Sequence, residues 1–438
     1  MRAVKYALAA LCLLLVVYNV GCHLSRQTIL YTDESWYIAS GIEMLKAHHF
    51  IVNTIWQHTD YRNTKPPLGL WGVMAGYSLP LPPLLAVRLF SLLAALATAL
   101  ATFLYGYRTR GFYVGLLAVL LLFTIPDFVT NHNARSADCD MLFIGMTTLG
   151  LLAFSRGRAK ALATGYFFLG LAFLAKSFHA LPYALAALAY TLYLVWIGRL
   201  SLRRSLLLPF CFYIPVLPWA VARYAHDGLQ FFSAMVQVDL LDRRYAVGGT
   251  QAIHSFYYFN SIQLGFGLAL IAAAIALIHP PARATLKSPT SILLLLWTAI
   301  PLSFLVSATN GFFWYVFPVF PAIALLIATP VVAAVQSEKR LYVVACSSLV
   351  LILLFSNEQR LQHWVSEVEL DPLSVALTQI HQQTGGRAAT VAIAGTPVPW
   401  SREYYATAVL YNLIPVNNLP AAAPDYLISA TNSVSRLH

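Results

Sequence analysis

About eleven apolar runs, most of them close to 20 residues long, recur along the chain and limit what it can fold into. A run of about 20 apolar residues is long enough to cross the hydrocarbon core of a bilayer as a helix. Only 10% of the residues are charged, whereas soluble domains carry about 25%. The sequence therefore predicts an all-α polytopic membrane protein. The predicted spans lie at 4–22, 86–106, 112–129, 140–155, 161–176, 179–197, 205–222, 259–278, 290–308, 312–334 and 340–356.

Lysine and arginine are concentrated in one set of connections between these runs. Because short cytoplasmic loops are enriched in these residues, we expect this set to face the cytoplasm of a cell (inner) membrane. The net charge of +11 then reflects membrane orientation and not nucleic-acid binding. The loops at 23–85 and 223–258 and the tail after 356 would lie outside. The basic residues of the cytoplasmic set are Arg2, Lys5, Arg108, Arg110, Arg156, Arg158, Lys160, Arg199, Arg203, Arg204, Arg283, Lys287, Lys339 and Arg340.

The first external loop carries the strongest chemical pattern. Adjacent carboxylates, Asp33 and Glu34, open it, and Lys65 stands directly before two prolines. Between them, residues 36–45 have the apolar spacing of a short helix along the membrane interface, and residues 68–83 predict a second interfacial helix. A positioned carboxylate can act in acid/base chemistry, and a lysine at the membrane edge can hold a lipid-linked phosphate. The acids could instead only cap the helix, where its dipole favours negative charge.

A second external turn places Arg135, Asp138 and Asp140 just before a predicted span. Two carboxylates spaced D-x-D can position a polar substrate or bind a divalent cation, so any metal would lie here. The pattern is common, and capping of the helix is the alternative. We expect Arg135 to be a partner of these acids.

Four further residues at external helix ends are candidates for contacts with a phosphate. Lys176 ends one span, Arg243 and Arg244 lie in the third external loop, and Tyr315 is part of an aromatic cluster. The arginine fork suits bidentate phosphate binding. The alternatives are snorkelling of Lys176, ion pairs of the arginines with Asp239 or Asp242, and interface anchoring by the aromatic cluster.

After residue 356 the composition changes to polar helical and strand-like segments. We therefore predict two domains, a transmembrane catalytic domain at 1–356 and a small external α/β appendage at 357–438. An appendage of about 80 residues is marginal alone and should dock on the membrane part.

The order of these motifs resembles the GT-C glycosyltransferases of the protein O-mannosyltransferase and aminoarabinose (lipid A) transferase group. The matching residues are Asp33-Glu34, Lys65-Pro66-Pro67, the Arg88-Leu89-Phe90-Ser91 segment, the second acidic motif, Leu174-Ala175-Lys176 and Tyr315. The resemblance covers about residues 28–330. It implies a GT-C fold and transfer of a sugar from a polyprenyl phosphate, which serves as co-substrate, to an acceptor outside the cytoplasm.

The resemblance also implies roles for individual residues. Asp33 would be the general base, with Glu34 beside it, and Lys65 would contact the donor phosphate with Arg243 or Arg244. A single base and direct displacement predict inversion at the anomeric carbon. The acceptor would be a hydroxyl group of a lipid, glycan or protein. A polymerase or ligase that uses polyprenyl pyrophosphate, and a lipid or polysaccharide transporter, are the alternative functions.

Overall fold

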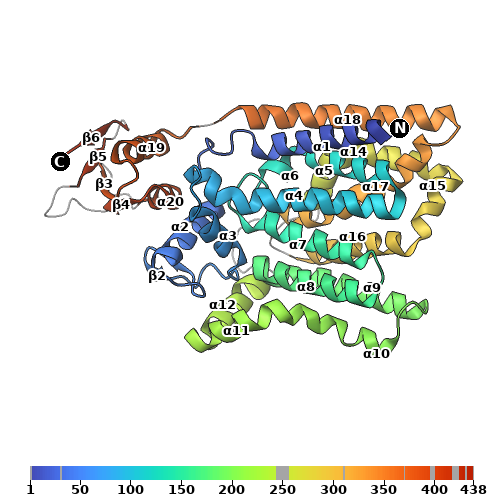
Figure 1. The fold of residues 1–438 in the computed structure, drawn as a ribbon, viewed down its shortest axis with the longest axis horizontal. Helices are drawn as coiled ribbons and strands as arrows, with labels where there is room; N and C mark the ends of the chain where they lie inside the picture. Colours follow the sequence, from blue (N-terminus) through green and yellow to red (C-terminus); the bar gives the residue numbers. More distant parts are fainter. Residues whose placement is uncertain are drawn as a thin grey trace.

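The computed structural model describes residues 2–29, 32–242, 256–308, 311–368, 370–394, 400–416, 424–429 and 432–437. Long helices run side by side as a bundle, and a small unit with strands lies at one end of it (Figure 1). Each predicted span overlaps one of these helices. The bundle consists of α1 (Arg2–Gly21), α4 (Pro83–Arg110), α5 (Phe112–Phe123), α7 (Cys139–Phe154), α8 (Ala159–Lys176), α9 (Leu181–Trp196), α11 (Tyr213–Asp227), α14 (Phe256–Ile278), α16 (Pro289–Ser307), α17 (Phe320–Val335) and α18 (Arg340–Ser366).

Among the described residues, eight helical segments are long and apolar enough to cross a membrane. One of them, Ala159–Trp196, contains both α8 and α9. These two helices are antiparallel, because the hydroxyl groups of Tyr166 and Thr191 lie 3.0 Å apart on either side of the turn. Helices α5 and α7 are apolar but have only 12 and 16 residues. The prediction of an all-α multi-pass membrane protein is confirmed.

The two ends of the bundle differ in what they carry. The N-terminus, α10 (Leu202–Ser205) and α15 (Pro280–Ala284) lie at one end, and α2, α3 and the C-terminal unit lie at the other (Figure 1). Arg203, Arg204 and Arg283 belong to α10 and α15, so basic connections gather at the first end. The remaining short helices are α6 (Pro126–Thr130), α12 (Gln230–Val236), η1 (Ser177–Ala180), η2 (Leu208–Phe212), η3 (Gln237–Leu241), η4 (Thr285–Lys287) and η5 (Phe313–Val319).

The first long loop folds into α2 (Thr32–Lys46), a short hairpin of β1 (Thr54–Ile55) and β2 (His58–Thr59), and α3 (Leu68–Tyr77). Helix α2 packs against α3 and α20 and is buried over most of its length. Gly41 allows this close packing, because a Cβ there would lie 2.8 Å from a methyl group of Val73 on α3. The loop is thus a packed platform that holds the start of α2 in a fixed position.

The C-terminal unit is a small α/β appendage, as predicted. Its four-stranded sheet has the order β4-β3-β5-β6, with β6 antiparallel and the other three strands parallel. The unit docks on the first loop: the Tyr405 hydroxyl donates to Glu43, and Lys46 donates to Asn412 at 3.0 Å. Helix α18 continues past the predicted boundary at 356 as far as Ser366. The elements are α19 (Pro372–Thr384), β3 (Ala389–Ile393), α20 (Arg402–Leu410), β4 (Leu413–Val416), β5 (Tyr426–Ile428) and β6 (Val434–Arg436).

Candidate active site

A polar cavity of about 160 Å³ lies where the first loop meets the ends of several bundle helices. It brings together six of the residues that the sequence singled out, from four separate segments: Asp33, Lys65, Asp138, Asp140, Lys176 and Tyr315. Trp36, Tyr37, Arg62, Asn63, Thr64, Val238, Asp239 and Phe312 complete its lining. Residues more than 280 positions apart in the chain therefore share one cavity.

Asp33 is the accessible carboxylate of this cavity. It lies in the first turn of α2, and its side chain is 54% exposed, whereas those of Asp138, Asp140 and Asp239 are at most 8% exposed. Among the described residues, the nearest cationic atom that pairs with it is Nδ1 of His132, at 3.9 Å. An incoming hydroxyl group can therefore reach Asp33 without breaking a tight ion pair.

His132 connects the two acidic motifs. Its Nδ1 lies 2.8 Å from an oxygen of Asp138, and its ring stacks on Trp314 with the centroids 4.2 Å apart. Burial lowers the pKa of His132, but its hydrogen bond with Asp138 and the nearby acidic charges outweigh this effect, so the pKa is raised. Burial, assisted by the charge of Asp140, raises the pKa of Asp138 to about 7. The pair therefore holds a proton more firmly than its ordinary pKa values suggest.

His132 is a site residue that the sequence pattern does not predict. It belongs to the same turn as Asp138, six positions earlier, but nothing in the local pattern indicates its orientation. Its backbone has φ 52°, which is the left-handed region and uncommon outside glycine. The turn that produces this geometry brings the imidazole back over Asp138.

Two lysine–aspartate ion pairs form one wall of the cavity. Nζ of Lys65 lies 2.6 Å from Oδ1 of Asp239, and Lys176 donates a hydrogen bond to Asp140. Ser177 donates to the other oxygen of Asp239. Among the described residues Asp239 pairs with Lys65, and the alternative ion pair of Asp239 with Arg243 or Arg244 lies outside the described residues.

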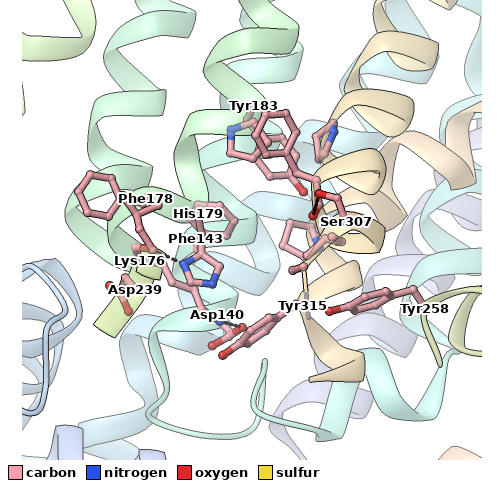
Figure 2. Close-up of a pocket in the computed structure, with 17 residues that line it drawn as sticks. Asp140, Phe143, Lys176, Phe178, His179, Tyr183, Asp239, Tyr258, Ser307 and Tyr315 are labelled. Carbon is pink, nitrogen blue, oxygen red and sulfur yellow. Dashed lines mark hydrogen bonds and ion pairs between the residues drawn. The ribbon is translucent and has the colours of Figure 1, made fainter. Parts of the chain in front are cut away.

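A second, mostly apolar cavity of about 220 Å³ adjoins the polar one. Its apolar lining includes Phe143, Phe178, Leu305 and Pro318, and Figure 2 shows Asp140 beside Tyr315 at one end of it. Four residues line both cavities: Asp140, Lys176, Asp239 and Tyr315. The Lys176 ammonium lies 4.6 Å from the centre of the Tyr315 ring. These four residues, which we call the boundary residues, lie between the apolar cavity and the polar cavity.

Glu34 lies in a different place from the one predicted. Its carboxylate is 1% exposed, does not line the polar cavity, and accepts hydrogen bonds of 2.7 and 3.1 Å from Arg88 on α4. The same carboxylate accepts from the backbone N–H of Ala137 at 2.8 Å. This placement argues against the predicted catalytic role of Glu34, because its charge is already neutralised by Arg88 and lies away from solvent.

Arg135 also lies elsewhere than expected. It donates to the backbone carbonyls of Asn19 and Cys22, at 3.1 and 2.7 Å, and makes none of the described contacts to Asp138 or Asp140. The expectation that it pairs with these acids is wrong, because the turn directs it toward the end of α1. Arg243 and Arg244, the other predicted phosphate contacts, lie outside the described residues.

Within the described ranges, two sets of donor atoms are close enough together to hold a cation. Asp33, His132 and Asp138 form one set, and Asp138, Cys139 and Asp140 form the other, with donor atoms within 4.8 Å of one another. The sequence analysis named Asp138 and Asp140 for any metal. In the structure Lys176 already neutralises Asp140, so the first set offers the freer carboxylate.

Comparison with known proteins supports a membrane glycosyltransferase fold. No protein-family model matches the chain. The chain superposes on ArnT of Cupriavidus metallidurans bound to undecaprenyl phosphate with a TM-score of 0.67 and 15% identity, covering 94% of this chain and 85% of that one. It superposes on the oligosaccharyltransferase AglB of Archaeoglobus fulgidus, bound to an inhibitory peptide and a dolichol-phosphate, with a TM-score of 0.59 and 11% identity, covering 96% and 65%.

The fold thus defines the class: the chain has the GT-C fold of ArnT and AglB, as the motif order predicted. In sequence it is similar to an undecaprenyl phosphate-α-4-amino-4-deoxy-L-arabinose arabinosyl transferase of Pseudomonas savastanoi pv. phaseolicola, with 27% identity over 311 residues. That match covers 68% of this chain and 56% of the relative. The chain therefore matches little more than half of the relative's length.

Proposed function

We propose that this protein is an inverting glycosyltransferase that moves a sugar from a polyprenyl monophosphate to an acceptor hydroxyl group outside the cytoplasm. The observation that carries the proposal is the junction of two cavities, one polar and lined by Asp33 and Lys65, the other apolar. A polyprenyl-linked sugar has the same division, with a hydrocarbon chain, a phosphate and a polar sugar in sequence. The phosphate would lie at the boundary residues, beside Lys65 and Lys176.

The reaction follows from this placement. The acceptor oxygen attacks the anomeric carbon of the donor while the bond from that carbon to the phosphate oxygen breaks. Asp33 takes the proton of the acceptor hydroxyl, and the polyprenyl phosphate leaves with the electron pair of the broken bond. A positioned carboxylate contributes about 10²–10⁴-fold to such a step. Because one displacement occurs, the configuration at the anomeric carbon inverts.

The lysines would stabilise the charge that develops on the leaving phosphate. Lys65 and Lys176 are only 12% and 6% exposed, so their charge is poorly screened by water. Glu34 and Arg88 would act through position. Glu34 follows Asp33 in α2 and binds the N–H of Ala137, the neighbour of Asp138, so the buried pair fixes the two acidic segments relative to each other.

The active site would face the extracytoplasmic side of the inner membrane. This placement is supported by the basic residues of α10 and α15 at the opposite end of the bundle from α2 and α3 (Figure 1). A donor on this side must already have crossed the membrane, which a lipid carrier achieves and a cytosolic nucleotide sugar does not. The acceptor would be a lipid, glycan or protein of the cell envelope.

The test compares envelope glycolipids and glycoproteins by mass spectrometry in cells with and without the gene. We expect one pentose- or hexose-modified species to disappear with the gene and to return with the wild-type gene but not with the Asp33→Asn variant. The purified protein in lipid nanodiscs should release polyprenyl phosphate when given the matching lipid-linked sugar and the acceptor fraction. Unchanged envelope components together with no polyprenyl phosphate release would contradict the proposal.

A further inference from the structure

Asp239 is a buried carboxylate that the proposed chemistry does not use. It belongs to η3, its side chain is 0% exposed, and it lies 2.6 Å from Nζ of Lys65 in the first loop, 174 positions away. Ser177 holds its second oxygen with a hydrogen bond. The lysine that should meet the donor phosphate is thus already occupied by a protein carboxylate in this structure.

The ion pair between Lys65 and Asp239 lies where the two cavities meet, and this position is what affects donor binding. Asp239 lines both the apolar and the polar cavity, whereas Lys65 lines the polar one. A phosphate that carries a lipid chain in one cavity and a sugar in the other must pass between the two, at the boundary residues. A phosphate approaching Lys65 there meets the Asp239 carboxylate as a competing anion.

We propose that Asp239 is an internal counter-ion that Lys65 exchanges for the donor phosphate, and that it sets the affinity and charge selectivity for the donor. This inference rests on the proposed function, because it assumes a phosphate-bearing donor at Lys65. Removing one member of a buried ion pair leaves an uncompensated charge, which is costly. The exchange avoids this cost for Lys65, which is paired with Asp239 before donor binding and with phosphate afterwards.

Asp239 also keeps a hydrogen-bond donor during this exchange. The hydroxyl group of Ser177 still donates to it when Lys65 turns to the phosphate, and Lys65 lines the polar cavity, where water can reach it. The repulsion between phosphate and carboxylate weakens donor binding by a fixed amount. That weakening favours release of the polyprenyl phosphate product, which carries the same charged group as the donor.

Charge selectivity follows from the same arrangement. Among the described residues that line both cavities, Lys176 is already matched by Asp140, and Asp239 takes up the charge of Lys65. A diphosphate brings at least one more negative charge to this place than a monophosphate. In a poorly screened site this extra charge is repelled by Asp239 and Asp140, so the site discriminates against polyprenyl diphosphates.

The test measures binding of a polyprenyl monophosphate and of the matching diphosphate to the full-length protein in nanodiscs. We expect Asp239→Asn to bind the monophosphate about tenfold more tightly, a change that corresponds to about 1.4 kcal/mol. The affinity for the diphosphate should increase by a larger factor than the affinity for the monophosphate. Asp242→Asn is the matched control, because Asp242 lies three positions away, is exposed and accepts a hydrogen bond of 2.6 Å from Gln237. It should leave both affinities unchanged.

Ser177→Ala gives a second measurement if Asp239→Asn does not fold. Loss of the hydroxyl group removes the donor that stays with Asp239 when Lys65 turns to the phosphate, so this variant should weaken monophosphate binding. Equal or weaker monophosphate binding in a folded Asp239→Asn, or equal or tighter binding in Ser177→Ala when only that variant folds, would overturn the inference. The proposed function fails separately, if the wild type binds neither lipid or if Lys65→Ala binds the monophosphate as well as the wild type does.

Discussion

The guanidinium group of Arg88 on α4 donates two hydrogen bonds, of 2.7 and 3.1 Å, to the carboxylate of Glu34 on α2. Both side chains are only 1% exposed. The same guanidinium donates to the backbone carbonyls of Leu24, Gln27 and Thr28. This contact ties α4 to the connection between α1 and α2. It also sets the direction in which the neighbouring Asp33 leaves the helix.

The first prediction concerns this pair. Glu34→Gln should destabilise the protein by about 3–5 kcal/mol, because it leaves the charge of Arg88 buried without a full partner. The measurement is the midpoint of thermal unfolding in detergent, together with transfer activity. Arg88→Lys should lose less stability than Glu34→Gln, since lysine keeps the positive charge but not the two-hydrogen-bond geometry of the guanidinium group. A Glu34→Gln protein with unchanged stability and no activity would instead return Glu34 to a chemical role.

The second prediction concerns the base. Asp33→Asn should reduce transfer by about 10²–10⁴-fold while the protein keeps its stability and binds the polyprenyl phosphate as before. The physical reason is that Asp33 is 54% exposed and, in the part of the chain that the structure describes, has no cationic partner closer than His132 at 3.9 Å, so an amide of the same shape changes proton transfer and little else. Donor binding and single-turnover transfer are measured on the same preparation. Turnover close to wild type would remove the assignment.

A third prediction concerns pH. The pKa values of Asp138, raised to about 7, and of His132, also raised, lie above those of the unfolded chain. Groups of this kind stabilise the fold below the unfolded pKa and lose that stabilisation as the pH rises through the folded pKa. The unfolding midpoint should therefore fall from about pH 4 to pH 7 as the Asp138 contribution is lost, and further above pH 6.5 as His132 loses its proton. Measured in EDTA, the Asp138→Asn variant should show a flatter profile, and an equally steep one would contradict this origin.

Metal removal gives the fourth prediction. Lys176 already neutralises Asp140, and His132 bonds with Asp138, so protein groups already hold the two carboxylates of the D-x-D motif. We therefore expect transfer to persist after EDTA treatment, at no less than about half of its rate, with little gain when Mg²⁺ or Mn²⁺ is restored. The same assay with Lys176→Ala should create a dependence on added cation. Loss of all activity in EDTA, restored by metal, would show that Asp33, His132 and Asp138 act as ligands.

The sequence by itself determined the membrane class, the helices of the bundle and the presence of a small α/β tail. Runs of about 20 apolar residues have few other stable forms, because a bilayer requires that backbone groups be satisfied within each helix. Local patterns also placed Asp33, Lys65, Asp138, Asp140, Lys176 and Tyr315 among the candidates, and all six line one cavity.

Only the tertiary structure decided how these charges pair. Glu34 and Asp33 are adjacent in sequence, yet one is buried against Arg88 and the other is exposed, since neighbouring positions on a helix point about 100° apart. Likewise Asp239, 174 positions from Lys65, could be matched to it only after α12 and η3 had folded over the first loop. Ion pairing depends on distances of a few ångströms between distant segments, and no local spacing encodes them.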